Sequence, residues 1–208
     1  MLETYTYINY SCSDNNIAKK IELLFLANNQ QKRYEHICSV VKRIDTIAIQ
    51  YELNREKCRL SAMLHDISTL IKWEDMLLYA KDNDWKLCDA EISHPFLLHQ
   101  RISEVVARED FGITDCDVLE SIAFHTSLCE NASQYQMALF IADKLDWSIG
   151  GYPPYYEQMI KALNISLEAT CYEYIKYVEG DGKMASIHSD WAKAVRWIKS
   201  IFKSLIST

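Results

Sequence analysis

The sequence predicts an all-α fold, and three observations favour that class. Only five glycines and three prolines occur in 208 residues, too few for a sandwich or barrel with many turns. Apolar residues recur at intervals of three and four along most of the chain, which is the period of an α-helix. Hydrophobic residues make up 49% of the sequence, enough for a sizeable core. We therefore expect one domain over residues 1–208, a helical bundle with additional C-terminal helices.

The first three helices are expected over residues 15–30, 31–51 and 55–67. Each carries an apolar stripe at helical spacing, and Asn54 stands at the N-cap position of the third. The main apolar positions of these stripes are Ile17, Ile21, Leu24, Phe25, Ile37, Val40, Ile44, Ile47, Leu60, Met63, Leu64 and Ile67. The pair His65-Asp66 is thereby placed inside the third helix.

A weaker helical pattern covers residues 72–88 and is interrupted by the polar run 82–84. Ser93 and Pro95 mark the start of the next helix, which is expected to reach about residue 110 and to be closed by Gly112.

Two capping patterns open the following helices. Thr114 with Asp117 predicts a helix over 115–125, and Ser133 with Gln136 predicts a capping box. The second of these helices carries Asp143 in its apolar sequence.

The rest of the chain is predicted to hold two long helices, over about 155–178 and 188–206, packed on the core of the domain. A turn is expected at Asp181-Gly182, and the Gly- and Pro-rich loop 148–154 is the candidate for a lid or boundary.

The charge balance argues against partners that are extended polyanions. The formal charge is −7 and the isoelectric point is near 5.4, with no basic patch evident in the sequence. We expect no extended nucleic-acid contact and no membrane binding. A phosphate-bearing small molecule would then be attracted by bound cations and a few placed Lys or Arg side chains.

The cysteines indicate a reducing compartment, because the seven of them show no CxxC motif and no even framework. The first residues show neither a basic nor an apolar leader pattern, and no stretch approaches the roughly 18 apolar residues of a membrane span. We expect a cytoplasmic protein, and the aromatic content is compatible with a homodimer.

Six histidines and aspartates form the most informative set in the sequence. Their side chains are the imidazole and carboxylate donors that divalent metals prefer, and a single such residue is more often a cap, a surface group or a hydrogen-bonded core residue. An aspartate beside an apolar stripe is different, since its burial costs several kcal/mol unless it is paired or metal-bound. The set comprises His36, His65, Asp66, His99, His125 and Asp143.

These residues occur within an ordered series of motifs: RYEH (33–36), LHD (64–66), LLH (97–99), FGI (111–113), HT (125–126) and FIADKLD (140–146). The series resembles the HD-domain metal-dependent phosphohydrolases, and within them the YqeK-type branch of symmetrical bis(5'-nucleosyl)-tetraphosphatases. The resemblance covers about residues 31–147.

The resemblance implies an all-helical fold, two divalent ions and cleavage of diadenosine tetraphosphate into two ADP. Iron is the first choice of metal, with manganese, magnesium or nickel as alternatives. His36, His65, Asp66 and Asp143 would hold the first ion, and Asp66 would bridge to a second ion held by His99 and His125. A hydroxide bridging both ions would attack an internal phosphorus in line, which makes Asp66 and His65 the central catalytic residues.

The expected substrate contacts are Arg33, Lys144, Arg101 and Thr126, of which only Arg101 falls outside the quoted motifs. Arg33 could equally pair with a carboxylate of its own helix, and Arg101 could face solvent. His94 and His188 have no counterpart in the motifs. The cluster Tyr152, Tyr155 and Tyr156 is more typical of packing than of base stacking.

The sequence departs from the family beside its expected ligands. Thr69 stands where a Lys is usual, Gln100-Arg101 replaces Gly-Pro, and Leu128 follows a motif that usually continues with Gly. Hydrolysis of another nucleotide or phosphate ester is therefore an alternative. So is a regulatory member that binds metal and nucleotide with little turnover, or a structural interaction module with a coincidental HD pair.

Overall fold

The computed structural model describes residues 1–10, 14, 16–146, 151–181 and 188–206, and within these ranges it contains helices and no strand. The all-α prediction is confirmed. The α-helices are α1 (Ile17–Ala27), α2 (Gln31–Gln50), α3 (Arg55–Leu64), α4 (Trp73–Asp82), α5 (Asp89–Ser93), α6 (His99–Asp110), α7 (Cys116–Ala123), α8 (Gln134–Leu145), α9 (Tyr156–Leu163), α10 (Leu167–Asp181) and α11 (Ser189–Ile206). The 3-10 helices are η1 (Leu2–Thr4), η2 (Ile67–Leu70) and η3 (Pro95–Leu98).

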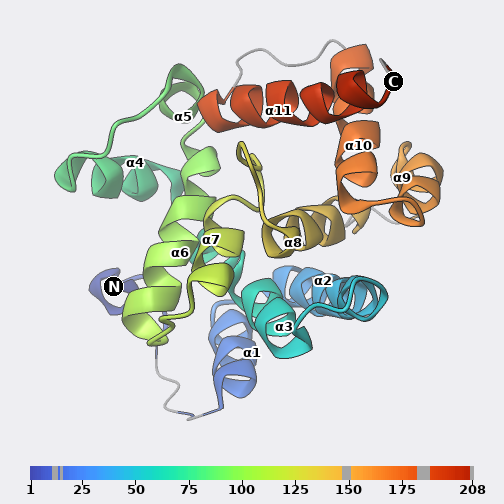
Figure 1. The fold of residues 1–208 in the computed structure, drawn as a ribbon. Helices are drawn as coiled ribbons and strands as arrows, with labels where there is room; N and C mark the ends of the chain where they lie inside the picture. Colours follow the sequence, from blue (N-terminus) through green and yellow to red (C-terminus); the bar gives the residue numbers. More distant parts are fainter. Residues whose placement is uncertain (11–13, 15, 147–150, 182–187, 207–208) are drawn as a thin grey trace.

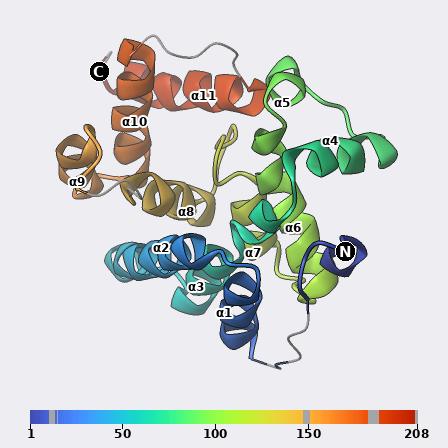
Figure 2. The ribbon, with the colours of Figure 1, turned by 180° about the vertical axis from the view of Figure 1, so that it is seen from behind.

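Helices α2, α3, α7 and α8 pack against one another at the centre of the fold (Figure 1). Helix α1 and the N-terminus flank one side of this centre, and α9, α10 and α11 cover the other (Figure 2). Two clusters of buried side chains fill the interior. Helix α2 contributes to both clusters. Its Ile37 packs in the cluster that includes side chains of α1, and its Val40 packs in the cluster that includes side chains of α8 and α10.

Local capping explains where several helices begin. The side chain of Asn54 accepts hydrogen bonds from the Glu56 and Lys57 amides at the start of α3. Ser133 and Gln136 form the expected reciprocal capping box of α8. These contacts confirm the predicted N-cap of α3 and the predicted capping box of α8.

Two helix boundaries differ from the prediction near the candidate ligands. Helix α3 ends at Leu64 rather than at residue 67, so His65 and Asp66 follow the helix instead of lying within it. The Nδ1 atom of His65 is hydrogen-bonded to the carbonyl of Ala62. The backbone of Asp66 leaves the helical region, with φ −107° and ψ 13°. Helix α7 is capped by Asp115, whose carboxylate accepts from the Val118 amide, and not by Thr114.

Helix α4 ends at Asp82, inside the polar run where a break was expected. The helix expected from Ser93 onward begins instead as η3 and continues as α6, and the short α5 before it was not predicted. Gly112 follows α6 with φ +66°, the left-handed conformation expected of a residue that closes a helix.

The prediction of one long helix over 155–178 is wrong, since this segment forms two separate helices, α9 and α10. Ser166 explains the break, because its hydroxyl accepts the Ala169 amide and so caps α10. Helix α11 occupies the predicted segment. Asp181 is the last residue of α10, and the rest of the expected turn, like residues 148–150 of the expected lid loop, lies outside the described residues.

No helix in the described part of the chain is both long and apolar enough to span a membrane.

Candidate metal centre

The six candidate ligands converge from five segments of the chain. His36 lies in α2 and Asp143 near the end of α8, whereas the other four stand at helix boundaries. His65 and Asp66 follow α3, and His99 is the first residue of α6. His125 lies just beyond the end of α7. The structure brings all six together at the point where these helices meet.

The imidazoles form two close pairs through their Nε2 atoms. The Nε2 atoms of His36 and His65 are 3.3 Å apart, and those of His99 and His125 are 3.0 Å apart. Asp143 Oδ1 lies 3.3 Å from His36 Nε2 and 3.8 Å from His65 Nε2. Each pair thus presents nitrogen donors to one common point.

Asp66 stands between the two pairs and turns one carboxylate oxygen to each. Its Oδ1 is 3.4 Å from His99 Nε2 and 3.6 Å from His125 Nε2. Its Oδ2 is 3.8 Å from His65 Nε2 and 3.9 Å from His36 Nε2. This is the arrangement that a carboxylate shared by two cations requires.

The opposite ring nitrogens fix the tautomers of three of these histidines. The Nδ1 atoms of His65, His99 and His125 lie 2.7, 2.5 and 2.8 Å from the carbonyls of Ala62, Phe96 and Ile122. Each of these three histidines is thereby held to the carbonyl of the residue three positions earlier in the chain. Because a carbonyl only accepts, Nδ1 carries the proton and Nε2 has a free lone pair.

Two free nitrogen lone pairs 3.0 Å apart, as in His99 and His125, repel unless a cation lies between them. Ligands at right angles on a metal with bonds of about 2.1 Å are separated by about 3 Å, the spacing found here. The donors therefore fit divalent metal ions. Three-residue groups whose donor atoms all lie within 4.8 Å of one another include His36, His65 and Asp143, and also His65, Asp66 and His125.

Burial and charge favour the ligating protonation states. Burial lowers the pKa of His65, and it lowers the pKa of His99 to about 4. Burial raises the pKa of Asp66 and Asp143, but the surrounding imidazoles, and Lys144 beside Asp143, outweigh it and hold both pKa values well below the usual range. Neutral imidazoles and ionised carboxylates are the forms that bind metals.

His36 differs, because two carboxylates face it. Burial lowers its pKa, yet hydrogen bonds with Asp143 and Asp146 raise it to about 10. The site thus attracts positive charge at this position, whether a proton or a metal ion.

Of the residues expected to contact substrate, Arg33 and Thr126 lie at the centre. Arg33 lines an open cleft of about 720 Å³ together with His36 and Asp66, and it forms no ion pair with a carboxylate in the described ranges. The alternative pairing on its own helix is therefore absent. The Thr126 hydroxyl lies 3.2 Å from His99 Nε2.

Lys144 is close to the centre but is already engaged, since its Nζ bonds Asp143 Oδ2 at 2.7 Å. Burial lowers the pKa of Lys144, but the charge of Asp143 makes the largest opposing contribution and the pKa is raised. Lys144 therefore balances the charge of a candidate ligand.

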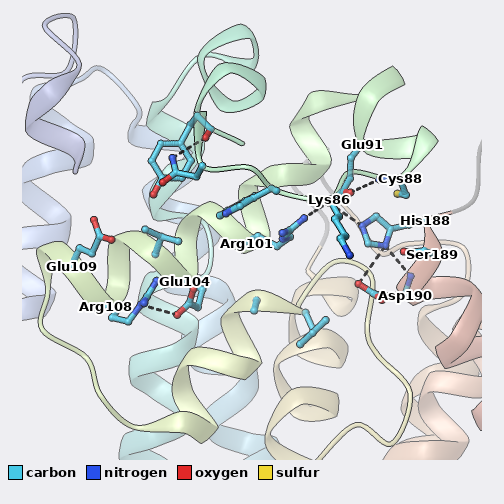
Figure 3. Close-up of a pocket in the computed structure, with 16 residues that line it drawn as sticks. Lys86, Cys88, Glu91, Arg101, Glu104, Arg108, Glu109, His188, Ser189 and Asp190 are labelled. Carbon is cyan, nitrogen blue, oxygen red and sulfur yellow. Dashed lines mark hydrogen bonds and ion pairs between the residues drawn. The ribbon is translucent and has the colours of Figure 1, made fainter. Parts of the chain in front are cut away.

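Arg101 does not reach the candidate ligands, which corrects its expected role. It lines a different pocket, where it donates to Glu91 at 3.1 Å (Figure 3). Its guanidinium also covers the ring of Trp85. Because α6 turns about 100° per residue, a side chain two positions after His99 points to another face of the helix.

His188 and Glu91, with Cys88, form a further group of metal-ligand type in that pocket (Figure 3). Its chemistry is different from that of the centre. His188 Nδ1 accepts the Asp190 amide, so its proton is on Nε2, which faces Glu91 Oε1 at 3.6 Å. The same oxygen accepts a hydrogen bond from the Arg101 guanidinium. In this Glu91 network, hydrogen bonds from Arg101 and the Cys88 amide to Glu91, with His188 Nε2 beside the carboxylate, join α5, α6 and the start of α11.

The tyrosine cluster packs against neighbouring aromatic rings, as Tyr155 is buried against Tyr174 and Tyr177. Tyr152 lies against Tyr156 at the surface. His94 is exposed.

The three departures from the family pattern have structural consequences. Thr69 is buried, and its hydroxyl donates to the Asp66 carbonyl at 2.6 Å. Gln100 Oε1 accepts the amides of Thr126 and Ser127 and so fixes the segment after His125. Leu128 is buried with φ +55°, a conformation that costs a non-glycine residue about 1–3 kcal/mol.

Asp146 is the residue that sequence reasoning missed. Its Oδ2 lies 2.5 Å from His36 Nδ1, and its Oδ1 accepts from Ser39. Its place three residues after Asp143, at the end of α8, was a signal that it lies near the ligands.

The HD domain family model matches residues 33–148, more than half of the chain and all six candidate ligands. The chain belongs to the HD domain family, and it is an enzyme of the hydrolase class.

Particular relatives are similar over different lengths. A symmetrical bis(5'-nucleosyl)-tetraphosphatase of Halalkalibacterium halodurans is 30% identical over 118 residues, which cover 56% of this chain and 62% of the relative. An uncharacterized protein in the pepC 5' region of Lactococcus lactis subsp. cremoris is 28% identical over 80% of this chain and 78% of its own length.

A crystal structure from Clostridium acetobutylicum, described as a predicted HD superfamily hydrolase involved in NAD metabolism, has a TM-score of 0.77 with this chain. It is 26% identical, and the match covers 88% of this chain and 97% of that chain.

Proposed function

We propose that the centre holds two divalent metal ions and hydrolyses a nucleotide, with diadenosine tetraphosphate cleaved symmetrically into two ADP. The observation that carries the proposal is the position of Asp66, which turns one oxygen to each pair of imidazoles. His36, His65, Asp66 and Asp143 are assigned to one ion, and His99, His125 and Asp66 to the other. Iron is the proposed metal, with manganese, magnesium or nickel as alternatives.

Divalent ions at such sites lower the pKa of coordinated water toward neutrality and neutralise charge on phosphate oxygens. The chain itself supplies orientation and charge. Asp66 and His65 are proposed as the central residues of catalysis. Their positions are set by the end of α3, where His65 is held to the Ala62 carbonyl.

Arg33 and Thr126 are proposed to contact the phosphates. The guanidinium of Arg33 lies in the open cleft without a carboxylate partner, so it is available to an anion. The Thr126 hydroxyl stands beside His99, at the other end of the ligand set. We assign Lys144 to the support of Asp143 rather than to substrate.

The symmetrical tetraphosphatase among the relatives supports this substrate, because it is 30% identical to this chain over 118 residues. Family membership favours an enzyme over a structural interaction module.

A second candidate is a hydrolase of another nucleotide or small phosphate ester. The buried Thr69 hydroxyl favours it, since the family's usual Lys would place a cation there and this chain has none. A member that binds metal and nucleotide with little turnover is a related alternative.

Substrate profiling separates these candidates. The manganese-loaded protein would be given dinucleoside tetraphosphates, mononucleotides and p-nitrophenyl phosphate at equal concentration. The proposal predicts the highest kcat/KM for a dinucleoside tetraphosphate. Higher kcat/KM for a mononucleotide or simple ester would favour the second candidate, and tight binding without product would favour the regulatory one.

We also infer a cytoplasmic protein whose 208 residues form one domain, working as a monomer or a homodimer. Six cysteines in the described residues are free thiols, which agrees with a reducing compartment.

A further inference from the structure

A small cavity of about 230 Å³ lies directly beside the candidate metal centre. Thr126 and Ser127 form its polar edge, and the Thr126 hydroxyl is 3.2 Å from His99 Nε2. Leu97, two residues before His99, forms another wall. A molecule bound at His99 and His125 would therefore have this cavity as its neighbour.

The remaining walls come from the C-terminal helices. Tyr174 and Val178 are four residues apart on α10 and so share one face of that helix, and Trp191 reaches in from α11. His188 separates the cavity from the Glu91 pocket shown in Figure 3, since it lines both. The cavity thus combines two aromatic rings, two aliphatic side chains and a hydroxyl-bearing edge.

The aromatic walls are supported by contacts with each other and with a buried ring. The rings of Tyr174 and Trp191 meet at 82° with centroids 5.9 Å apart, forming a corner. The buried ring of Phe140 supports both, at 5.5 Å from Tyr174 and 6.2 Å from Trp191. Gln100 fixes the polar edge through the amides of Thr126 and Ser127. Preorganised aromatic corners of this kind bind planar rings at little entropic cost.

The size of the cavity limits its ligand. Pockets that enclose a whole drug-sized molecule measure about 300–1,000 Å³. A cavity of about 230 Å³ suits one part of a nucleotide, and its apolar aromatic lining is suited to the base rather than to phosphate.

We propose that this cavity receives the nucleobase of the nucleotide whose phosphates lie at the metal centre, stacked on Tyr174 or Trp191. The proposal rests on the nucleotide-hydrolysing function proposed above. It assigns base recognition to α10 and α11, which lie beyond the residues matched by the HD domain model.

The test is equilibrium binding, so that it does not depend on turnover. Calorimetry would measure ADP and inorganic pyrophosphate against the manganese-loaded protein, because the two ligands share a diphosphate and differ in the nucleoside. Val178→Phe fills the cavity from its rim, where Val178 is only partly buried. Ile165→Phe adds the same ring at a position that is 78% exposed and serves as the control. Thermal unfolding verifies that both variants are folded.

We expect wild-type protein to bind ADP more tightly than pyrophosphate, and Val178→Phe to weaken ADP binding about tenfold while pyrophosphate binding changes less than about twofold. The control variant should match wild type. ADP binding that is unchanged in Val178→Phe, or that weakens together with pyrophosphate binding, would overturn the proposal, as would equal affinity of wild type for both ligands. Failure to hydrolyse diadenosine tetraphosphate, with the expected binding pattern intact, would instead refute the hydrolase assignment alone.

Discussion

The Nδ1 atom of His36 lies 2.5 Å from Oδ2 of Asp146, whereas the Nδ1 atoms of the other three histidines of the centre face main-chain carbonyls. Ser39, one turn after His36 on α2, donates to the second oxygen of Asp146. The end of α8 is thereby tied to α2. Carboxylate partners of this kind orient a ligating imidazole and raise its basicity.

Replacing Asp146 should weaken metal binding without unfolding the protein. We expect Asp146→Ala to lower metal affinity about 10- to 100-fold, as second-layer partners of metal ligands do. Asp146→Asn should lose less, because its amide oxygen still accepts the His36 proton. Metal affinity would be measured by competition with a fluorescent chelator. Asp45→Asn, which removes a carboxylate paired with Arg55 and Arg59 away from the centre, is the control. Wild-type affinity in Asp146→Ala would refute the positioning role.

Removal of Asp66 should affect both metals at once. Since one oxygen of Asp66 faces each histidine pair, Asp66→Ala is expected to abolish turnover and to leave less than one metal per chain. Elemental analysis of the purified protein provides the measurement. Asp117→Ala, at a surface pair with Lys57, should keep the wild-type metal content. Two ions per chain in Asp66→Ala would exclude a bridging role.

Arg33 should contribute binding energy rather than chemistry. A charge-assisted hydrogen bond to a phosphate contributes about 1.5–3 kcal/mol, so Arg33→Met is expected to raise KM about tenfold or more. The value of kcat should stay within about threefold, because the contact is present in ground and transition states alike. Steady-state kinetics would be compared with Arg59→Met, which alters a guanidinium paired with Asp45. A fall in kcat at unchanged KM would show that Arg33 acts on the transition state instead.

The Glu91 network should stabilise the fold in a manner that depends on pH. Burial raises the pKa of Glu91, but the neighbouring His188 imidazole and the hydrogen bonds from the Cys88 amide and Arg101 outweigh it and lower the pKa from its ordinary 4.5 to about 2. A folded-state pKa below the unfolded value gives stability that is complete above pH 4.5 and is lost as the pH falls toward 2. Glu91→Gln should therefore reduce the free energy of unfolding by about 2–3 kcal/mol at pH 7, and by about half as much or less at pH 3.

Urea unfolding of wild type and Glu91→Gln at pH 7, 4 and 3 tests this dependence. The exposed Glu109→Gln variant is the matched control and should follow wild type at each pH. A difference between wild type and Glu91→Gln that is the same at all three pH values would show that the carboxylate charge has no part in the effect.

The sequence identified the helical class and the helix starts that depend on local contacts. Asn54 and Ser133 act on amides two or three residues away, and such patterns are visible in a single sequence. The break at Ser166 had the same kind of signal, but the amphipathic pattern continued across it.

Contacts between distant segments were not accessible in this way. Asp146 and His36 are separated by 110 positions, and although the nearness of Asp146 to Asp143 in sequence indicates the region of the ligands, it does not identify His36 as the partner. Arg101 was placed at the centre because of its nearness to His99 in sequence, whereas the rotation of α6 turns it toward Glu91. The left-handed conformation of Leu128 has no signal in the leucine itself, and only the glycine usual at this place in the family indicates a positive φ.

The most direct test of the metal-dependent hydrolase is a product analysis. Purified protein with iron(II) or manganese(II) would be given diadenosine tetraphosphate, and the products would be separated by anion exchange with and without a chelator. The account predicts ADP as the only product and no product in the presence of chelator. ATP with AMP, or turnover that a chelator leaves unchanged, would contradict it.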